Sequence, residues 1–65
     1  MKRRDLERHL AGRGCEVLRE GGGHTIWRNP ATGARAPVPR HREIKPTLAR
    51  VICGQLGVPL PPELT

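Results

Sequence analysis

The histidine that directly follows three glycines is the residue of this chain best placed for chemistry. The segment reads Gly21-Gly22-Gly23-His24. Glycines let a phosphate approach the backbone, and histidine titrates near neutral pH, so it can both take up and return protons. On RNA, His24 could remove the proton of a 2′-hydroxyl, which then attacks the neighbouring phosphate without a metal ion. A histidine that only caps the turn by a hydrogen bond is the alternative interpretation.

The two other histidines have weaker claims to a role in chemistry. His41 lies in the basic run Pro39-Arg40-His41-Arg42-Glu43 and could be a second proton carrier. The alternative, which the sequence favours, is that His41 orders this connector through hydrogen bonds or contacts a partner protein. His9 falls within a predicted helix and is interpreted as a surface or half-buried helix residue.

The spacing of potential metal ligands does not predict a metal site or a cofactor. No two of Cys15, His24, His41 and Cys53 are separated by the two to five residues typical of structural zinc sites. The six carboxylates are scattered and suggest no two-metal nuclease. The chain has no second pair of cysteines that would make a disulfide framework, so Cys15 and Cys53 are expected to be reduced, buried thiols.

The charge balance predicts a polyanionic partner. Twelve Lys and Arg against six Asp and Glu give a net charge of +6, and ten of the twelve cations are arginines. The planar arginine fork grips phosphate and stacks on bases, which suits RNA better than a membrane. An acidic protein partner would explain the charge equally well. The candidates for phosphate contacts are Arg4, Arg8, Arg13, Arg19, Arg28, Arg35, Arg40, Arg42 and Lys45.

Three of these cations are singled out by their expected positions. Arg19 and Arg28 lie on predicted strands on either side of the glycine turn. Lys45 precedes Pro46, which suits the first position of a helix, and phosphates often meet helix N-termini. We therefore expect RNA contacts from Arg19, Arg28 and Lys45, together with the turn glycines Gly22 and Gly23.

The elements that must position these residues follow from hydrophobic spacing, turn residues and β-branched content. The pattern predicts, in order, a helix over Lys2–Gly12, strands over Cys15–Arg19, His24–Arg28 and Ala34–Val38, and a helix from Pro46 to the stop at Gly57. The second helix is expected to bury a stripe of Leu48, Val51, Ile52 and Leu56. Segment 29–33 reads as a turn. Because Pro37 and Pro39 cannot donate ladder hydrogen bonds, the third strand is expected at an edge, or paired only through alternate residues.

These elements predict an α+β fold in which both helices cover one face of a three-stranded antiparallel meander and leave the other face open. Trp27, the only aromatic residue, should supply much of a thin core. Which face of the second strand meets the helices stays open. Residues 1–58 are interpreted as one domain and residues 59–65 as a proline-rich tail that can hold neither helix nor central strand. No apolar stretch could span a membrane and no signal region is apparent, so the chain is expected to be cytoplasmic.

The topology resembles the double-stranded-RNA-binding domain, and the sequence also resembles a specific family. The segments that carry this resemblance are Met1-Lys2-Arg3-Arg4-Asp5-Leu6, Gly14-Cys15-Glu16, Leu18-Arg19-Glu20-Gly21-Gly22, His24-Thr25-Ile26-Trp27, Asn29-Pro30 and Val38-Pro39-Arg40-His41-Arg42-Glu43-Ile44. In this order and spacing they are similar to the HicA family of toxins, from Lys2 to about Val58.

The resemblance implies a toxin of a type II toxin–antitoxin system that acts as an mRNA interferase, an endoribonuclease that cuts mRNA and arrests translation. The family's catalytic histidine maps onto His24, and Gly22 and Gly23 map onto the turn before it. Gly23 stands where many members carry a polar residue, and the stretch between Ile44 and Leu48 lacks their Gly-Thr step. The implied partner is a HicB-like antitoxin that blocks His24 and brings the complex to operator DNA. A basic RNA-binding module without catalysis is the alternative function.

Overall fold

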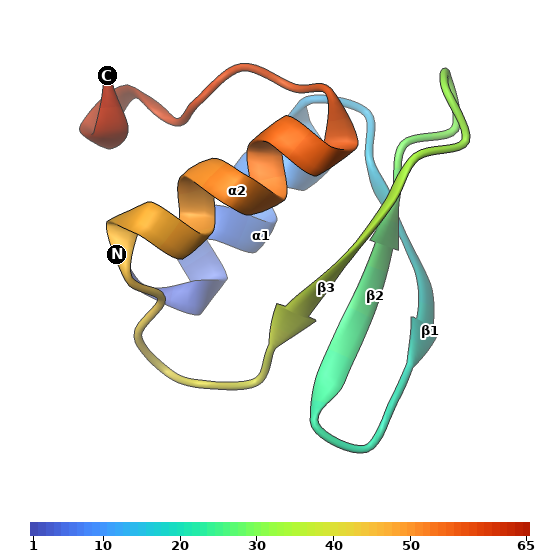
Figure 1. Ribbon diagram of the computed structural model, residues 1–65, viewed down its shortest axis with the longest axis horizontal. Helices are drawn as coiled ribbons and strands as arrows, with labels where there is room; N and C mark the ends of the chain where they lie inside the picture. The colour runs from blue at the N-terminus through green and yellow to red at the C-terminus, as the bar shows by residue number, and fades with distance from the viewer.

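The computed structural model describes residues 1–65 and has the α-β-β-β-α order predicted from the sequence (Figure 1). The elements are α1 (Arg3–Gly12), β1 (Glu16–Glu20), β2 (His24–Arg28), β3 (Arg35–Pro39) and α2 (Pro46–Leu56), followed by a short 3₁₀ turn at Pro62–Leu64. The bounds of the two helices and three strands differ from the predicted ones by at most one residue, which is the usual uncertainty of element ends. Neither α1 nor α2 is long and apolar enough to cross a membrane.

The sheet is an antiparallel meander with β2 at its centre and β3 at one edge, as predicted. Pro37 lies opposite Ile26, and Pro39 opposite His24. On the other side of β2, the register of β1 shifts around Leu18, which adds an extra residue to that strand. All five residues of β1 are exposed, so this strand extends beyond the part of the sheet that the helices cover (Figure 1).

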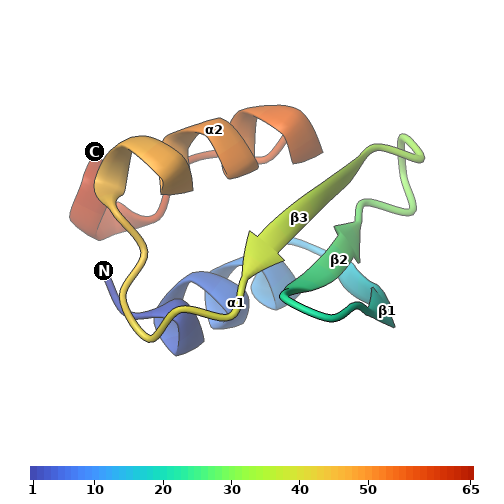
Figure 2. The ribbon, with the colours of Figure 1, turned by 60° about the horizontal axis from the view of Figure 1, so that its bottom comes forward.

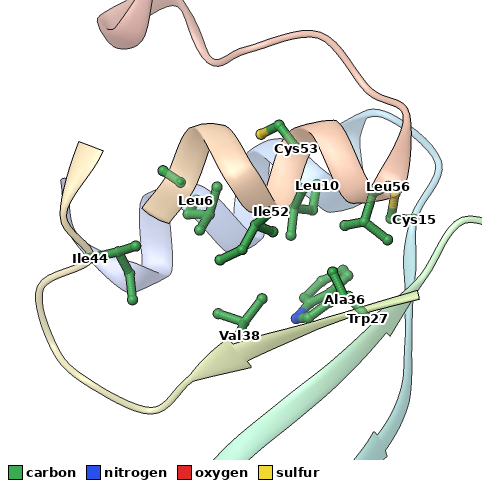
Figure 3. Packing of buried hydrophobic residues seen from close by; sticks show 11 residues of the cluster. Leu6, Leu10, Cys15, Trp27, Ala36, Val38, Ile44, Ile52, Cys53 and Leu56 are labelled. Carbon is green, nitrogen blue, oxygen red and sulfur yellow. The ribbon is translucent and has the colours of Figure 1, made fainter. Parts of the chain in front are cut away.

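Both helices pack on the same side of the sheet, and the hydrophobic core lies between them and β2 and β3 (Figure 2). Trp27, Ala36 and Val38 point from the sheet toward Leu6 and Leu10 of α1 and Ile52 and Leu56 of α2 (Figure 3). The indole of Trp27 is 6% exposed, and its Nε1–H donates a hydrogen bond of 3.1 Å to Glu7 Oε2. The burial pattern of β2 answers the question that the sequence left open: Thr25 and Trp27 face the helices, and His24 lies on the opposite face.

The predicted apolar stripe of α2 is partly wrong. The buried residues are Ala49, Ile52, Cys53 and Leu56, and Leu48 and Val51 are 38% and 51% exposed. The observed set also has the i, i+3, i+4, i+7 spacing of one helix face. Because it includes two small residues, α2 can lie close to its neighbours, and two large apolar side chains are left on the surface.

The turn between β2 and β3 is tied to the end of α2. Asn29 is 7% exposed; its side-chain N–H donates to the carbonyl of Leu56 at 2.8 Å, and its Oδ1 accepts the N–H of Ala31 at 3.0 Å. Gly33 closes the turn with φ 79°. The asparagine therefore shapes the turn predicted here and also satisfies a terminal carbonyl of the helix.

Residues 59–65 pack back onto the helices. Pro61 is buried, Leu60 and Leu64 rest against the core, and Pro59 accepts a hydrogen bond of 2.7 Å from the ring of His9. His9 is half-buried, as predicted. The segment contains the 3₁₀ turn at Pro62–Leu64, so the expectation that it holds no helix was too strict.

Candidate functional site

His24 and His41 line a common hollow of about 390 Å³ on the surface between the end of β3 and the start of α2. Lys45 lines the same hollow, and its other walls include Pro39, Glu43 and Leu48. His24 comes from β2, whereas His41 and Lys45 both come from the connector between β3 and α2. The hollow therefore brings together two groups that can exchange protons and one fixed positive charge.

His24 is the first residue of β2 and is exposed. Its strand neighbour across the sheet is Pro39 of β3, which leads directly into the connector that carries His41. Neither imidazole takes part in a hydrogen bond within the chain. The ring of His24 thus does not cap the turn, and the ring of His41 does not fasten the connector.

The glycine turn before His24 is held at its base by the main chain and by one carboxylate. The N–H of Gly21 donates to the carbonyl of His24 at 2.7 Å, and the N–H of Arg40 donates to the carbonyl of Gly23 at 3.2 Å. Glu20 accepts the Thr25 hydroxyl at 2.7 Å and the Arg40 guanidinium at 2.8 Å through the same oxygen. These bonds fix the backbone around His24 without using its ring.

The connector that carries His41 is fixed by pairing with the first residues of the chain. Lys2 and Glu43 form an isolated antiparallel bridge, and the N–H of Ile44 donates to the carbonyl of Met1 at 2.7 Å. Ile44 is 2% exposed and anchors the connector in the core. Sequence patterns did not reveal this pairing, because a single bridge between residues some forty positions apart leaves no periodic signal.

The cations predicted to contact RNA are not all gathered at this hollow. Lys45 lines it and is the N-cap residue of α2, so the positive end of the helix dipole lies there as well. Arg19 and Arg28 are not among its lining residues. Arg28 is paired with Glu16 of β1 at 3.3 Å, and Arg19 lies opposite Ile26 in the sheet.

The two cysteines are free and buried, as predicted. Burial raises the pKa of the Cys15 thiol; burial, and then the nearby Cys15, raise the pKa of the Cys53 thiol. Thiols of this kind stay protonated at neutral pH and are poor nucleophiles. No three His, Cys, Asp or Glu side chains are grouped so that they could hold a metal ion.

Comparisons with known proteins give one finding. No curated protein and no solved structure matches the chain. The family model of the HicA toxin of bacterial toxin–antitoxin systems matches residues 3–58, which span α1, the whole sheet and α2. The match includes the glycine turn, both histidines of the hollow and Lys45. The chain therefore belongs to the HicA toxin family, the toxins of bacterial toxin–antitoxin systems.

Proposed function

We propose that this toxin is an mRNA interferase that cuts RNA at the hollow shared by His24 and His41, without a metal ion. One imidazole takes the proton of a ribose 2′-hydroxyl, and the freed oxygen attacks the adjacent phosphorus. The bond to the downstream 5′-oxygen breaks, and that oxygen receives a proton from the other imidazole. The products are a 2′,3′-cyclic phosphate and a free 5′-hydroxyl.

The observation that carries this proposal is that two exposed, unbonded imidazoles line one hollow with Lys45. One ring alone could serve as base and later as acid, but two rings can do both in one step, on opposite sides of the phosphorus. Lys45 and the N-terminal end of α2 would stabilise the negative charge that builds up on the phosphate oxygens. Gly22 and Gly23 leave room for the phosphate beside the turn.

The test is cleavage of a long mRNA by purified protein in excess EDTA, with His24→Ala and His41→Ala compared with His9→Ala. We expect His24→Ala to lower the cleavage rate by about 10²- to 10⁴-fold, the usual contribution of a positioned acid–base group, with RNA binding retained. His9→Ala is the matched control, because its ring lies on α1 and only bonds to the carbonyl of Pro59.

The pH profile separates the roles of the two histidines. If one ring acts as base and the other as acid, the wild-type rate rises and then falls with pH, and His41→Ala should remove one limb of that profile. A His41→Ala protein that cuts at the wild-type rate and with the wild-type profile would restrict the chemistry to His24. RNA that is bound but left intact by the wild-type protein would instead identify a binding module without catalysis.

The partner that masks this toxin is proposed to be a HicB-like antitoxin that covers the hollow and carries the complex to operator DNA. Leu48 lines the hollow, and Val51 follows one helical turn later; both are large apolar side chains on the surface. A protein partner can bury exposed apolar side chains of this kind beside the polar site. RNA binding does not require such apolar surface.

A further inference from the structure

A second hollow is lined only by cationic side chains. It measures about 140 Å³, lies between the first turn of α1 and the connector, and is lined by Lys2, Arg3, Arg4 and Arg42. No acidic or apolar residue contributes to its walls. Like charges gathered around a small space repel one another, and an anion bound there would relieve this repulsion.

Main-chain hydrogen bonds join the two segments that carry these cations. The N–H of Arg3 donates to the carbonyl of Arg42 at 3.0 Å, next to the bridge between Lys2 and Glu43. The connector thus runs beside the start of α1, although some forty residues separate the two segments (Figure 1). The backbone positions of the cations are therefore fixed on both sides of this junction.

Most of this charge has no counter-ion within the chain. Arg3 has a carboxylate oxygen of Glu7 at 3.7 Å, but no carboxylate lies within 4.0 Å of Lys2, Arg4 or Arg42. The nearby Glu43 is paired with the amino group of Met1. Three of the four cations are therefore free to bind an external anion.

We propose that this cationic hollow binds a backbone phosphate of the RNA beside the linkage that is cut. This inference rests on the proposed nuclease function for its position along the substrate. His41 lines the histidine hollow, and the next residue, Arg42, lines the cationic one. Because the two hollows are lined by neighbouring residues of one connector, we infer that a single RNA strand reaches both.

The chemistry of the walls favours RNA over an acidic protein segment. Arginine grips phosphate with paired, charge-assisted hydrogen bonds, and three of the four walls are arginines. Protein interfaces bury an apolar centre, and this hollow has none. A phosphodiester needs only the charge and the hydrogen-bond donors that are present.

Binding of a single-stranded RNA that is 2′-O-methylated throughout tests the proposal. Such an RNA has no attacking hydroxyl, so binding is measured independently of cleavage. The variant is Arg4→Gln with Arg42→Gln, and the matched control is Arg13→Gln with Arg50→Gln, which removes the same charge from exposed arginines outside both hollows. Arg13 is a phosphate candidate by its charge alone, and the structure places it after the C-terminal end of α1, whereas the cationic hollow lies at the start of that helix. Thermal unfolding monitored by Trp27 fluorescence verifies that every protein is folded.

We expect the hollow variant to bind at least about tenfold more weakly, and its plot of log K against log salt to be shallower by about 0.7 for each phosphate that is no longer neutralised. The control should keep nearly the wild-type affinity and slope. Equal decreases in affinity for both variants would overturn the proposal, because they would reflect net charge alone. An unchanged RNA affinity with weakened antitoxin binding would also overturn it and assign the hollow to the protein partner.

The outcome can be separated from that of the nuclease proposal. Cleavage of ordinary RNA by the wild-type protein is a distinct measurement from binding of the methylated RNA. If the wild-type protein does not cut RNA but needs Arg4 and Arg42 for binding, the phosphate site is supported and the nuclease proposal is contradicted. If the variant with both arginines replaced cuts at the wild-type rate and binds RNA with the wild-type affinity, the nuclease proposal is supported and the phosphate site is contradicted.

Discussion

The three glycines before His24 are not equivalent at the level of single atoms. A Cβ at Gly21 would lie 3.1 Å from the carbonyl oxygen of His24, whereas a Cβ at Gly22 or Gly23 would meet nothing within 4 Å. None of the three takes a left-handed backbone conformation. Packing therefore explains glycine at position 21, but nothing inside the protein requires it at positions 22 and 23.

Alanine substitutions in this turn should separate folding from RNA cleavage. Gly22→Ala and Gly23→Ala should leave the thermal midpoint unchanged or raise stability by about 0.4–1 kcal/mol, since the unfolded chain loses freedom. Their cleavage rates should fall if the phosphate approaches the backbone there. Gly21→Ala is the contrasting variant and should lower the midpoint. Wild-type cleavage rates for both Gly22→Ala and Gly23→Ala would show that the substrate does not approach the backbone of the turn.

The sequence singled out His24 as a candidate because glycine and histidine side by side form a local pattern. The position of His41 beside it could not be predicted, since it depends on the bridge between Lys2 and Glu43. The same bridge creates the cationic hollow around Arg42. Local chemistry was therefore readable from the residues, but the grouping of side chains depended on one long-range backbone contact.

At the scale of elements, α2 shows that hydrophobic spacing alone does not determine which face of a helix is buried. Two overlapping stripes fit this helix, and the sequence favoured the one with the larger side chains, Leu48 and Val51. The structure buries the one with Ala49 and Cys53. Small residues are weak hydrophobic signals, but they let the helix backbone approach β3. The type and length of the element were predictable, whereas its rotation depended on packing.

This rotation predicts a large loss of stability for one substitution and almost none for its neighbour. Ile52→Ala should lower the free energy of unfolding by about 2–5 kcal/mol, because the side chain is 1% exposed in the core. Val51→Ala should change it by no more than about 0.5 kcal/mol, because the side chain is on the surface. Urea unfolding measures both. Val51→Ala should also weaken antitoxin binding in a titration; a wild-type affinity would remove this face from the proposed interface.

At the scale of the whole molecule, turn residues and prolines determine most of the architecture. The turn at Asn29 and Gly33, the helix stop at Gly57 and the edge position of the Pro37 strand all occur where local chemistry predicts them. The core is small: eleven buried apolar residues form it, and two of them are cysteines. A change in the charge state of either thiol would consequently be felt by the entire fold.

The buried thiols make the folded protein lose stability at high pH. Burial raises the pKa of Cys15 and Cys53 above the usual value of 9.0, so between the unfolded and folded values the native state holds protons that the unfolded chain releases. Stability therefore decreases as pH rises through this window, while below about pH 9 the contribution is fully present. Urea unfolding from about pH 7 to about pH 10.5 measures the decline. The comparison is the double variant Cys15→Ala with Cys53→Ala, which is less stable overall but should have a flatter pH dependence. Equal slopes would show that the thiols do not cause the decline.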